Sequence, residues 1–262
     1  MDSLVLSGWG FSLWMGLLGL ISGSFMNVVI YRLPIMLDAK ETSSGDINLW
    51  LPNSFCPECH HSLRWFDNIP LLSWLLLRGH CRYCNATISW RYPAIEFVCA
   101  LGFAMLTILF PSPTTALSLA IFLWFVLALS AIDLKVLLLP DLLTLPLLWL
   151  GLIYNSLYGT IPLEDGVYGA VAGYLALWII YWSFRLTTGR EGMGYGDFKM
   201  LAAIGAWCGW QALPPVVLIA ALVGIFISLI RIFMHKAADK TLPFGPCLAC
   251  AGMVVLGWLN LT

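Results

Sequence analysis

A glycine-rich segment that carries an aspartate, Gly192-Met193-Gly194-Tyr195-Gly196-Asp197-Phe198-Lys199, lies where an apolar stretch of the chain begins. Glycines let a backbone pass close to another chain and adopt a positive φ. A carboxylate at the edge of a bilayer is costly, so it indicates a functional site. A second acid, Asp133, ends another apolar stretch. Two carboxylates are the minimum equipment of an aspartic protease.

Four cysteines form a second group with recognisable chemistry. They make two Cys-x-x-Cys pairs, Cys56 with Cys59 and Cys81 with Cys84, separated by 21 residues. This spacing is typical of a tetrahedral thiolate zinc site. Because four protein ligands leave no open position, we expect the zinc ion to be structural. Free thiols or a redox pair are the alternative, and the neighbouring histidines could replace a ligand: His60, His61 and His80.

The composition predicts a membrane protein built from helices. Of the 262 residues, 60% are hydrophobic and only 10% are charged, whereas soluble domains carry about 25% charged residues. The net charge of −1 gives no basic surface for nucleic acid. The first apolar run lacks the basic start and the small-residue cleavage site of a secretory signal, so we expect it to be retained as a span.

About eight apolar stretches are long enough to cross a bilayer, which takes roughly 20 residues each. The sixth of them is short and rich in Gly and Trp, so a re-entrant segment is its alternative. The predicted spans are Gly8–Tyr31, Pro93–Phe110, Thr115–Leu137, Asp141–Leu157, Val167–Phe184, Asp197–Leu213, Val216–Phe233 and Pro246–Leu261.

Charge predicts the orientation of these spans, because cytoplasmic loops carry the excess of Lys and Arg. With an outer N-terminus and eight crossings, all 13 Lys and Arg residues fall on the cytoplasmic side. We therefore expect both termini outside. The chain then divides into a first transmembrane helix (1–33), a small cytoplasmic zinc-binding domain (34–92) and a seven-helix membrane core (93–262).

This topology places the two acids at similar depth on the inner face. Asp133 ends the third span and Asp197 begins the sixth. The alternative for Asp133 is an interfacial acid paired with Lys135, and the alternative for Asp197 is a helix cap. Asp141 follows Pro140 at the start of the fourth span, where an acid is an ordinary cap. We interpret Asp141 as structural and as the reserve catalytic acid.

Other residues near the acids are candidates for binding a substrate. The glycines Gly192, Gly194 and Gly196 leave room for an extended backbone, and Lys199 is near enough in sequence to tune Asp197. Glu96 is a third intramembrane acid, which could pair with Arg91 or with a substrate amine.

The ordered set of motifs resembles bacterial type IV prepilin peptidases, the bifunctional leader peptidases and N-methyltransferases of type IV pilus and type II secretion systems. Gly-x-Gly-Asp alone is shared with presenilin-like enzymes, but the full set is specific and covers nearly the whole chain. The marks are Gly23-Ser24-Phe25-Met26-Asn27-Val28, Arg32-Leu33-Pro34, both cysteine pairs, Arg91-Tyr92-Pro93 with Glu96, Ala131-Ile132-Asp133, Pro140-Asp141, the Gly192–Lys199 segment and Pro243-Phe244-Gly245-Pro246.

The resemblance implies an activity, its partners and its cofactors. The catalytic pair would be Asp133 and Asp197, and the four cysteines of the family's inner loop would correspond to Cys56, Cys59, Cys81 and Cys84. The substrate would be a prepilin or pseudopilin with a short basic leader ending in Gly, cut at the cytoplasmic face of the bacterial inner membrane. The new amino terminus would then be methylated with S-adenosylmethionine, and both chain termini would be periplasmic.

The residues alone do not locate the methyl-transfer site. No Gly-x-Gly-x-x-Gly fingerprint follows a strand, so the cofactor site must be irregular. Asn27, Arg32, Arg91 and Glu96 are candidates because they are polar and on the inner face. Ordinary snorkelling and helix pairing are the alternative interpretation of these side chains.

Three other functions remain compatible with the sequence. Glycine-broken helices with intramembrane acids also mark transporters, although those acids tend to lie near the midplane and no internal repeat is evident here. A non-catalytic scaffold that docks partners through the zinc domain predicts that both acids can be replaced without loss. A peptidase without methyltransferase activity is the third.

Overall fold

The computed structural model describes residues 8–42, 48–51, 53–159, 161–190, 193–234 and 243–261. Within these ranges the chain is helical, with two isolated antiparallel bridges and no β-strand. The predicted all-α class is therefore confirmed. The chain divides into two compact units, Met1–Trp124 and Phe125–Thr262, and the boundary falls inside one long helix.

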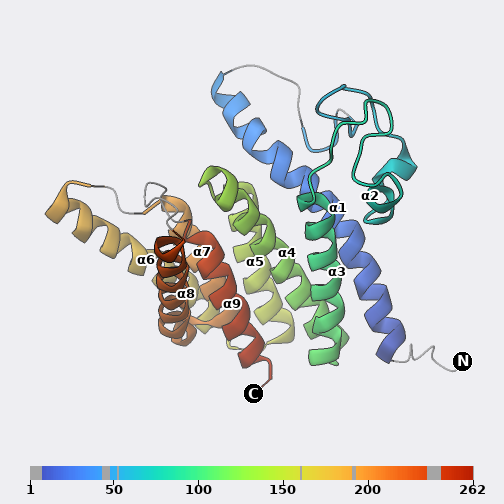
Figure 1. Cartoon of the computed structure of the whole chain (residues 1–262). Helices are drawn as coiled ribbons and strands as arrows, with labels where there is room; N and C mark the ends of the chain where they lie inside the picture. The colour runs from blue at the N-terminus through green and yellow to red at the C-terminus, as the bar shows by residue number, and fades with distance from the viewer. Residues whose placement is uncertain are drawn as a thin grey trace, which may run out of the picture. The chain divides into compact units, whose positions relative to one another are not determined.

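The first unit is built on two long helices that pack along each other, α1 (Gly8–Thr42) and α3 (Arg91–Leu109), as Figure 1 shows. Thr107 on α3 donates a hydrogen bond to Ser12 on α1, at 2.7 Å between the hydroxyl oxygens. The loop segment between these helices holds two short elements, η1 (Trp65–Asn68) and α2 (Leu72–Leu76).

Helix α1 continues well past the predicted end of the first span at Tyr31, and it contains Pro34. The charge of Arg32 and the proline at position 34 favour an end at Tyr31, yet the mostly apolar residues 33–37 continue the helix. A proline removes one backbone donor from a helix interior, and here the helix runs on for eight more residues.

The second unit surrounds a short central helix, α7 (Tyr195–Cys208), which packs against α5 (Asp141–Tyr158), α6 (Leu163–Thr188) and α9 (Gly245–Leu259). All but three residues of α7 are buried. Trp207 donates from Nε1 to the backbone oxygen of Leu147 at 2.8 Å, which fixes α7 against α5. The last half of α4 (Pro113–Val136), η2 (Trp210–Ala212) and α8 (Leu213–Phe233) complete this unit.

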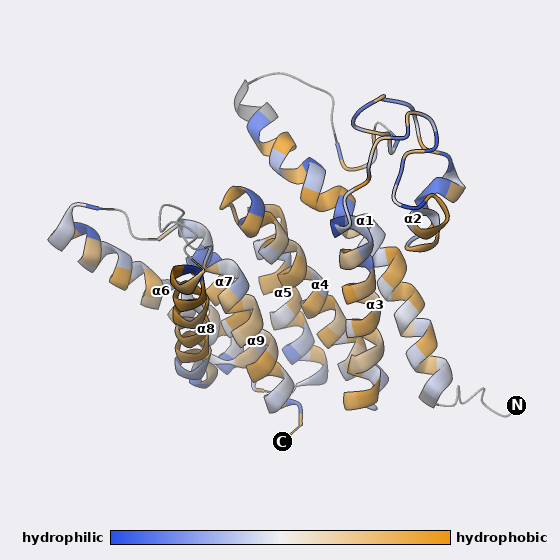
Figure 2. Ribbon diagram, in the orientation of Figure 1, coloured by the Kyte–Doolittle hydropathy of each residue, from blue (hydrophilic) through white to orange (hydrophobic). Residues whose placement is uncertain are grey.

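Five helices in the described part of the chain are long and apolar enough to cross a membrane: Trp9–Asp38, Arg91–Leu109, Pro113–Val136, Leu163–Thr188 and Trp210–Phe233. Many of their residues are hydrophobic, as the orange parts of the ribbon in Figure 2 show. The other three predicted spans are also helices, namely α5, α7 and α9. The 14 residues of α7 rise only about 21 Å, against roughly 30 Å of hydrocarbon.

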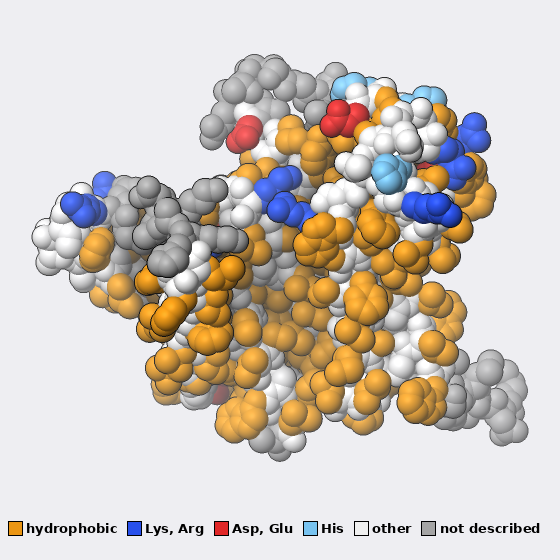
Figure 3. Space-filling view, viewed as in Figure 1, with side chains coloured by type: hydrophobic (Ala, Val, Ile, Leu, Met, Phe, Trp, Pro, Cys, Tyr) orange, Lys and Arg blue, Asp and Glu red, His pale blue; other side chains and the backbone are white. Residues whose placement is uncertain are grey.

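Apolar side chains cover the outside of the long helices. Leu17, Leu101 and Phe226 are each more than half exposed, as expected for helices that face lipid rather than water. In Figure 3 orange side chains cover the visible helix faces of the first unit, and Lys, Arg and His side chains gather over its loop segment.

Candidate active site and metal centre

Asp133 lies in the last turn of α4 and is buried. Its Oδ2 accepts a hydrogen bond of 2.9 Å from the backbone N–H of Gly245, the first residue of α9. The amino end of a helix favours negative charge, because its first N–H groups have no partner within the helix. The start of α9 therefore both holds and stabilises the Asp133 carboxylate.

Asp197 is the third residue of α7 and is also buried. Its carboxyl group interacts electrostatically with Asp133 and takes a hydrogen bond from the backbone of Gly194, the residue that precedes α7. In a capping box, an acidic side chain at the third helical position accepts a hydrogen bond from the backbone N–H of the residue that precedes the helix, and Asp197 stands in this position. The thiol of Cys247 lies within electrostatic range of both acids. The structure thus brings the two predicted acids into one buried group.

The predicted glycines differ in what surrounds them. A Cβ at Gly194 would lie 4.0 Å from Oδ2 of Asp197, so the space beside the acid is open there. A Cβ at Gly196 would come within 2.7 Å of the Cβ of Leu139, so this position needs glycine for close packing inside the protein. Gly192 lies outside the described residues.

Lys199 pairs with Asp141. Its Nζ lies 2.6 Å and 2.9 Å from the two carboxylate oxygens, so the ion pair is bidentate and links α7 to the first turn of α5. The sequence placed Lys199 beside Asp197 because the two residues are close along the chain. On a helix, however, residues two apart do not face each other, and the lysine reaches the neighbouring helix instead.

The four predicted cysteine ligands meet in the loop segment of the first unit. All four sulfur atoms lie within 4.8 Å of one another, and Sγ of Cys56 is 3.8 Å from Sγ of Cys84. A tetrahedral ion with Zn–S bonds of about 2.3 Å places its sulfurs roughly 3.8 Å apart. The donor set and spacing therefore fit a four-thiolate metal site.

Each cysteine pair sits on a tight turn of the same design. The first cysteine of each pair accepts a backbone hydrogen bond from the residue four positions later, His60 to Cys56 at 2.9 Å and Asn85 to Cys81 at 3.0 Å. Both donors have positive φ, at 54° and 60°. Backbone hydrogen bonds from Cys84 and Tyr83 lower the pKa of the Cys81 thiol to about 7, whereas burial and the neighbouring thiols raise the pKa of the Cys84 thiol to about 12.

The histidines beside the cysteines take other partners. Nδ1 of His80 lies 2.7 Å from the backbone oxygen of Arg78. The ring of His61 packs on Tyr83, and that of His60 stacks on Phe55. Among the described residues, the group able to hold a metal contains only the four cysteines.

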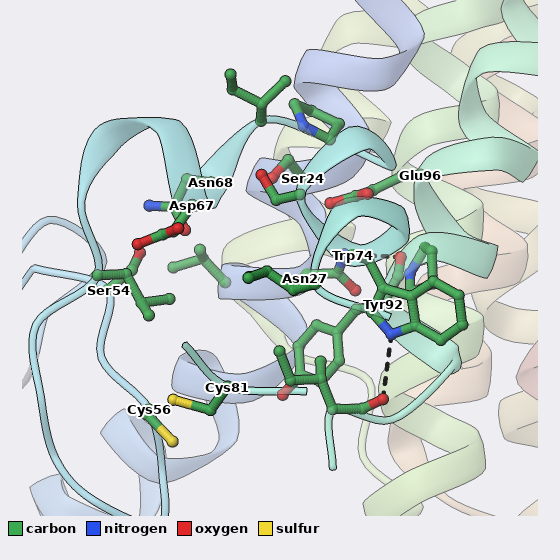
Figure 4. Close-up of a pocket in the computed structure, with 18 of the residues that line it drawn as sticks. Ser24, Asn27, Ser54, Cys56, Asp67, Asn68, Trp74, Cys81, Tyr92 and Glu96 are labelled. Atoms are coloured by element: carbon green, nitrogen blue, oxygen red, sulfur yellow. Dashed lines mark hydrogen bonds between the residues drawn. The ribbon is translucent and has the colours of Figure 1, made fainter. Parts of the chain in front are cut away.

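Glu96 lines a pocket of about 770 Å³ in the first unit, enclosed by α1, the loop segment and the start of α3 (Figure 4). Its Oε2 accepts a hydrogen bond of 2.8 Å from the backbone N–H of Leu71, and Ser24 and Asn27 also hydrogen-bond the carboxyl group. Asn27 in turn donates to the backbone oxygen of Tyr92 at 3.2 Å. Glu96 thus joins both helices to the loop segment.

Sequence reasoning missed the contact that Gly245 makes with Asp133. The segment Pro243-Phe244-Gly245-Pro246 was noticed only as one mark of a family. The signal was present, because proline at the second position of a helix and glycine at the first indicate a helix start close to an anionic group. The partner, 112 residues away, could not be identified from spacing.

Comparison with known proteins agrees with this arrangement. Residues 17–110 match the Bacterial Peptidase A24 N-terminal domain, and residues 120–229 match the Type IV leader peptidase family. Two relatives are named prepilin leader peptidase/N-methyltransferase. The one from Aeromonas hydrophila is 50% identical to this chain, over 92% of this chain and 89% of the relative. The one from Pectobacterium carotovorum subsp. carotovorum is 49% identical, over 94% of each chain. No solved structure matches the chain. The chain therefore belongs to the type IV leader peptidase family.

Proposed function

We propose that this protein removes the leader from type IV prepilins or type II secretion pseudopilins with Asp133 and Asp197, and then N-methylates the new amino terminus. The observation that carries the proposal is the pairing of two buried carboxylates, from α4 and α7, within electrostatic range of each other. Both activities are supported by the names of relatives that are about half identical to this chain over nearly its whole length.

The cleavage needs no group beyond the two carboxylates and water. Two neighbouring carboxylates cannot both ionise easily, so they share one proton. The ionised carboxylate takes a proton from a water molecule, whose oxygen attacks the scissile carbonyl carbon while the protonated carboxyl group donates a hydrogen bond to the carbonyl oxygen. When the C–N bond breaks, the nitrogen takes the proton and becomes the new amino terminus. A partly dry site strengthens each of these interactions.

The proposed topology keeps eight crossings, with both termini periplasmic and the two acids at the cytoplasmic face. Helix α7 is short, but it is enclosed by α5, α6 and α9 rather than exposed to lipid. A helix buried in protein does not have to match the hydrocarbon thickness, since its ends can be met by other protein groups. The distribution of all 13 Lys and Arg residues supports the same orientation.

The substrate contacts are proposed for residues near the acids in the second unit and for Glu96 in the first unit. Gly194 gives an extended backbone access to the Asp197 carboxyl group, and Gly196 keeps α7 close to Leu139. Gly192 is proposed as a substrate contact from its place in the sequence motif alone. Lys199 acts through its ion pair with Asp141, which holds the start of α7 in place. Glu96, in the pocket of the first unit, binds the amino group of the cleaved pilin.

The four clustered cysteines are proposed to hold a structural zinc ion. The loop segment between α1 and α3 has only short helices and isolated bridges. A segment of this kind has little core of its own, so the binding energy of a metal supplies part of its folding energy. The ion would fix both cysteine turns and with them one wall of the pocket, which Cys56 and Cys81 line.

Removing one zinc ligand is expected to remove the ion and unfold the loop segment. The purified Cys56→Ser variant should carry less than about a tenth of the wild-type zinc, since wild type should bind about one ion per chain. Its loop segment should also be cut much faster by a protease. Cys250→Ser is the control, because that exposed cysteine lies outside the cluster. Wild-type zinc content in Cys56→Ser would contradict a four-cysteine site.

The proposed function is tested by incubating the purified protein with a prepilin and S-adenosylmethionine and weighing the products by mass spectrometry. We expect a free leader and a mature pilin that carries one methyl group on its new amino terminus. A prepilin with valine in place of the last glycine of its leader is the control and should stay intact. If the wild-type protein, in a detergent that preserves the fold of the enzyme, leaves the native prepilin intact, the result contradicts the peptidase proposal and favours the transporter or scaffold interpretation.

A further inference from the structure

The pocket of the first unit has the size and composition of a small-molecule site. Its volume of about 770 Å³ falls within the roughly 300–1,000 Å³ typical of ligand pockets. Figure 4 shows Trp74 and Tyr92 on one side of it and Asp67 on the other, with Asn27 and Glu96 between the helices. Trp74 is held in place by a hydrogen bond of 3.1 Å from Nε1 to the backbone oxygen of Ile88.

Asp67 carries an unused acceptor in the wall of this pocket. Its side chain is only 2% exposed, and Oδ1 lies 2.8 Å from the guanidinium of Arg82. Oδ2 is buried and has no hydrogen-bond partner among the described residues. Buried polar atoms are nearly always paired, and leaving a charged acceptor unpaired is costly. A ligand that donates a hydrogen bond, such as a ribose hydroxyl, would satisfy this oxygen.

The charges around the pocket favour a cationic ligand. Five charged side chains line it: Arg32, Glu58, Asp67, Arg82 and Glu96. Both arginines are already engaged within the protein, Arg82 by Asp67 and Arg32 by the backbone oxygen of Asn48 at 3.0 Å. The charges of Asp67 and Arg82 cancel in their ion pair, so Glu58 and Glu96 outnumber Arg32 by one negative charge, and aromatic faces also attract cations.

We propose that this pocket binds S-adenosylmethionine, with the ribose hydroxyls on Asp67 and the sulfonium near the carboxylate and aromatic groups. The inference rests on the proposed function, because it names the site of its second step. S-adenosylmethionine combines a ribose diol, a flat adenine and a sulfonium cation, which match the unused acceptor, the aromatic side chains and the acids. When bound, it supplies an electrophilic methyl group, and Glu96 would hold the pilin amine in the same pocket.

The binding test uses Asp67→Asn and measures S-adenosylmethionine affinity directly by equilibrium dialysis with the purified full-length protein. The change keeps the shape, but Arg82 holds the amide oxygen and the donor NH₂ group replaces the unused acceptor. We expect affinity to fall by about tenfold or more, with prepilin cleavage and zinc content unchanged. Asp165→Asn is the control, because this half-buried acid belongs to the second unit and accepts hydrogen bonds from Trp210 and Gln211.

Affinity of Asp67→Asn within twofold of wild type would overturn the proposal. A second measurement does not depend on a variant: irradiation of wild-type protein with radiolabelled S-adenosylmethionine should label peptides from residues 53–96. Label confined to residues 125–262 would also overturn it. Failure of cleavage in wild-type protein would reject the proposed peptidase function without changing either binding result, so the two failures are distinguishable.

Discussion

Replacing Asp133 or Asp197 by asparagine should lower the rate of leader cleavage by about a thousand-fold or more. Asparagine keeps the volume of the side chain but can neither take a proton from water nor share one with its neighbour. Because the two acids act as one unit, either change alone should remove nearly all of the rate. The measurement is the initial rate of cleavage of a purified prepilin, with insertion and zinc content checked for each variant.

Two other aspartates serve as comparisons for this prediction. Asp165→Asn should cleave at the wild-type rate, since this half-buried acid accepts hydrogen bonds from Trp210 and Gln211. Asp141→Asn should retain cleavage within about tenfold, because Asp141 acts only through its ion pair with Lys199. Near-wild-type cleavage by Asp133→Asn or Asp197→Asn would reject the dyad, and loss in Asp141→Asn with full activity in Asp133→Asn would make Asp141 the catalytic acid.

The second large effect is expected at Gly245, which has no side chain and touches the dyad with its backbone. A Cβ at this position would lie 2.6 Å from Oδ2 of Asp133 and 3.1 Å from its Cγ. Alanine must therefore push the carboxylate away and weaken the hydrogen bond from the Gly245 N–H. Since a misplacement of about 1 Å can cost 100-fold in rate, Gly245→Ala should lower kcat by about that factor.

The Gly245 prediction separates positioning from substrate binding and from general damage. KM should change by less than about threefold, because Gly245 contacts the acid rather than the substrate. Gly16→Ala is the matched control, since a Cβ there would meet nothing closer than 3.7 Å. A Gly245→Ala protein with normal kcat would show that Asp133 does not depend on the start of α9 for its geometry.

The helices of this protein were predictable because an apolar run of sufficient length has few alternatives. Each of the eight predicted stretches corresponds to a helix with ends within a few residues of those expected, except where α1 continues to Thr42. Hydropathy does not show whether a helix is surrounded by other helices or by lipid. The sequence therefore could not distinguish α7, which is buried on nearly all sides, from α8, whose buried residues are few.

The cluster of four cysteines could be predicted from sequence because the cysteines come in two local pairs. Two residues three apart on a tight turn necessarily point the same way, so only the meeting of the two pairs was undetermined. In contrast, Lys199 was placed beside Asp197 by sequence proximity and instead reaches Asp141, 58 residues away. The unpaired Oδ2 of Asp67 was not predictable either, because it is left unpaired only when Arg82 binds Oδ1.

We propose that cleavage belongs to the dyad of the second unit and methyl transfer to the pocket of the first. The most direct measurement takes the double variant Asp133→Asn/Asp197→Asn and follows two rates in one preparation: cleavage of intact prepilin, and methylation of a pilin that has already lost its leader. We expect undetectable cleavage with methylation within about twofold of wild type. Cleavage at a measurable fraction of the wild-type rate, or loss of methylation in protein that retains its zinc and still binds S-adenosylmethionine, would contradict it.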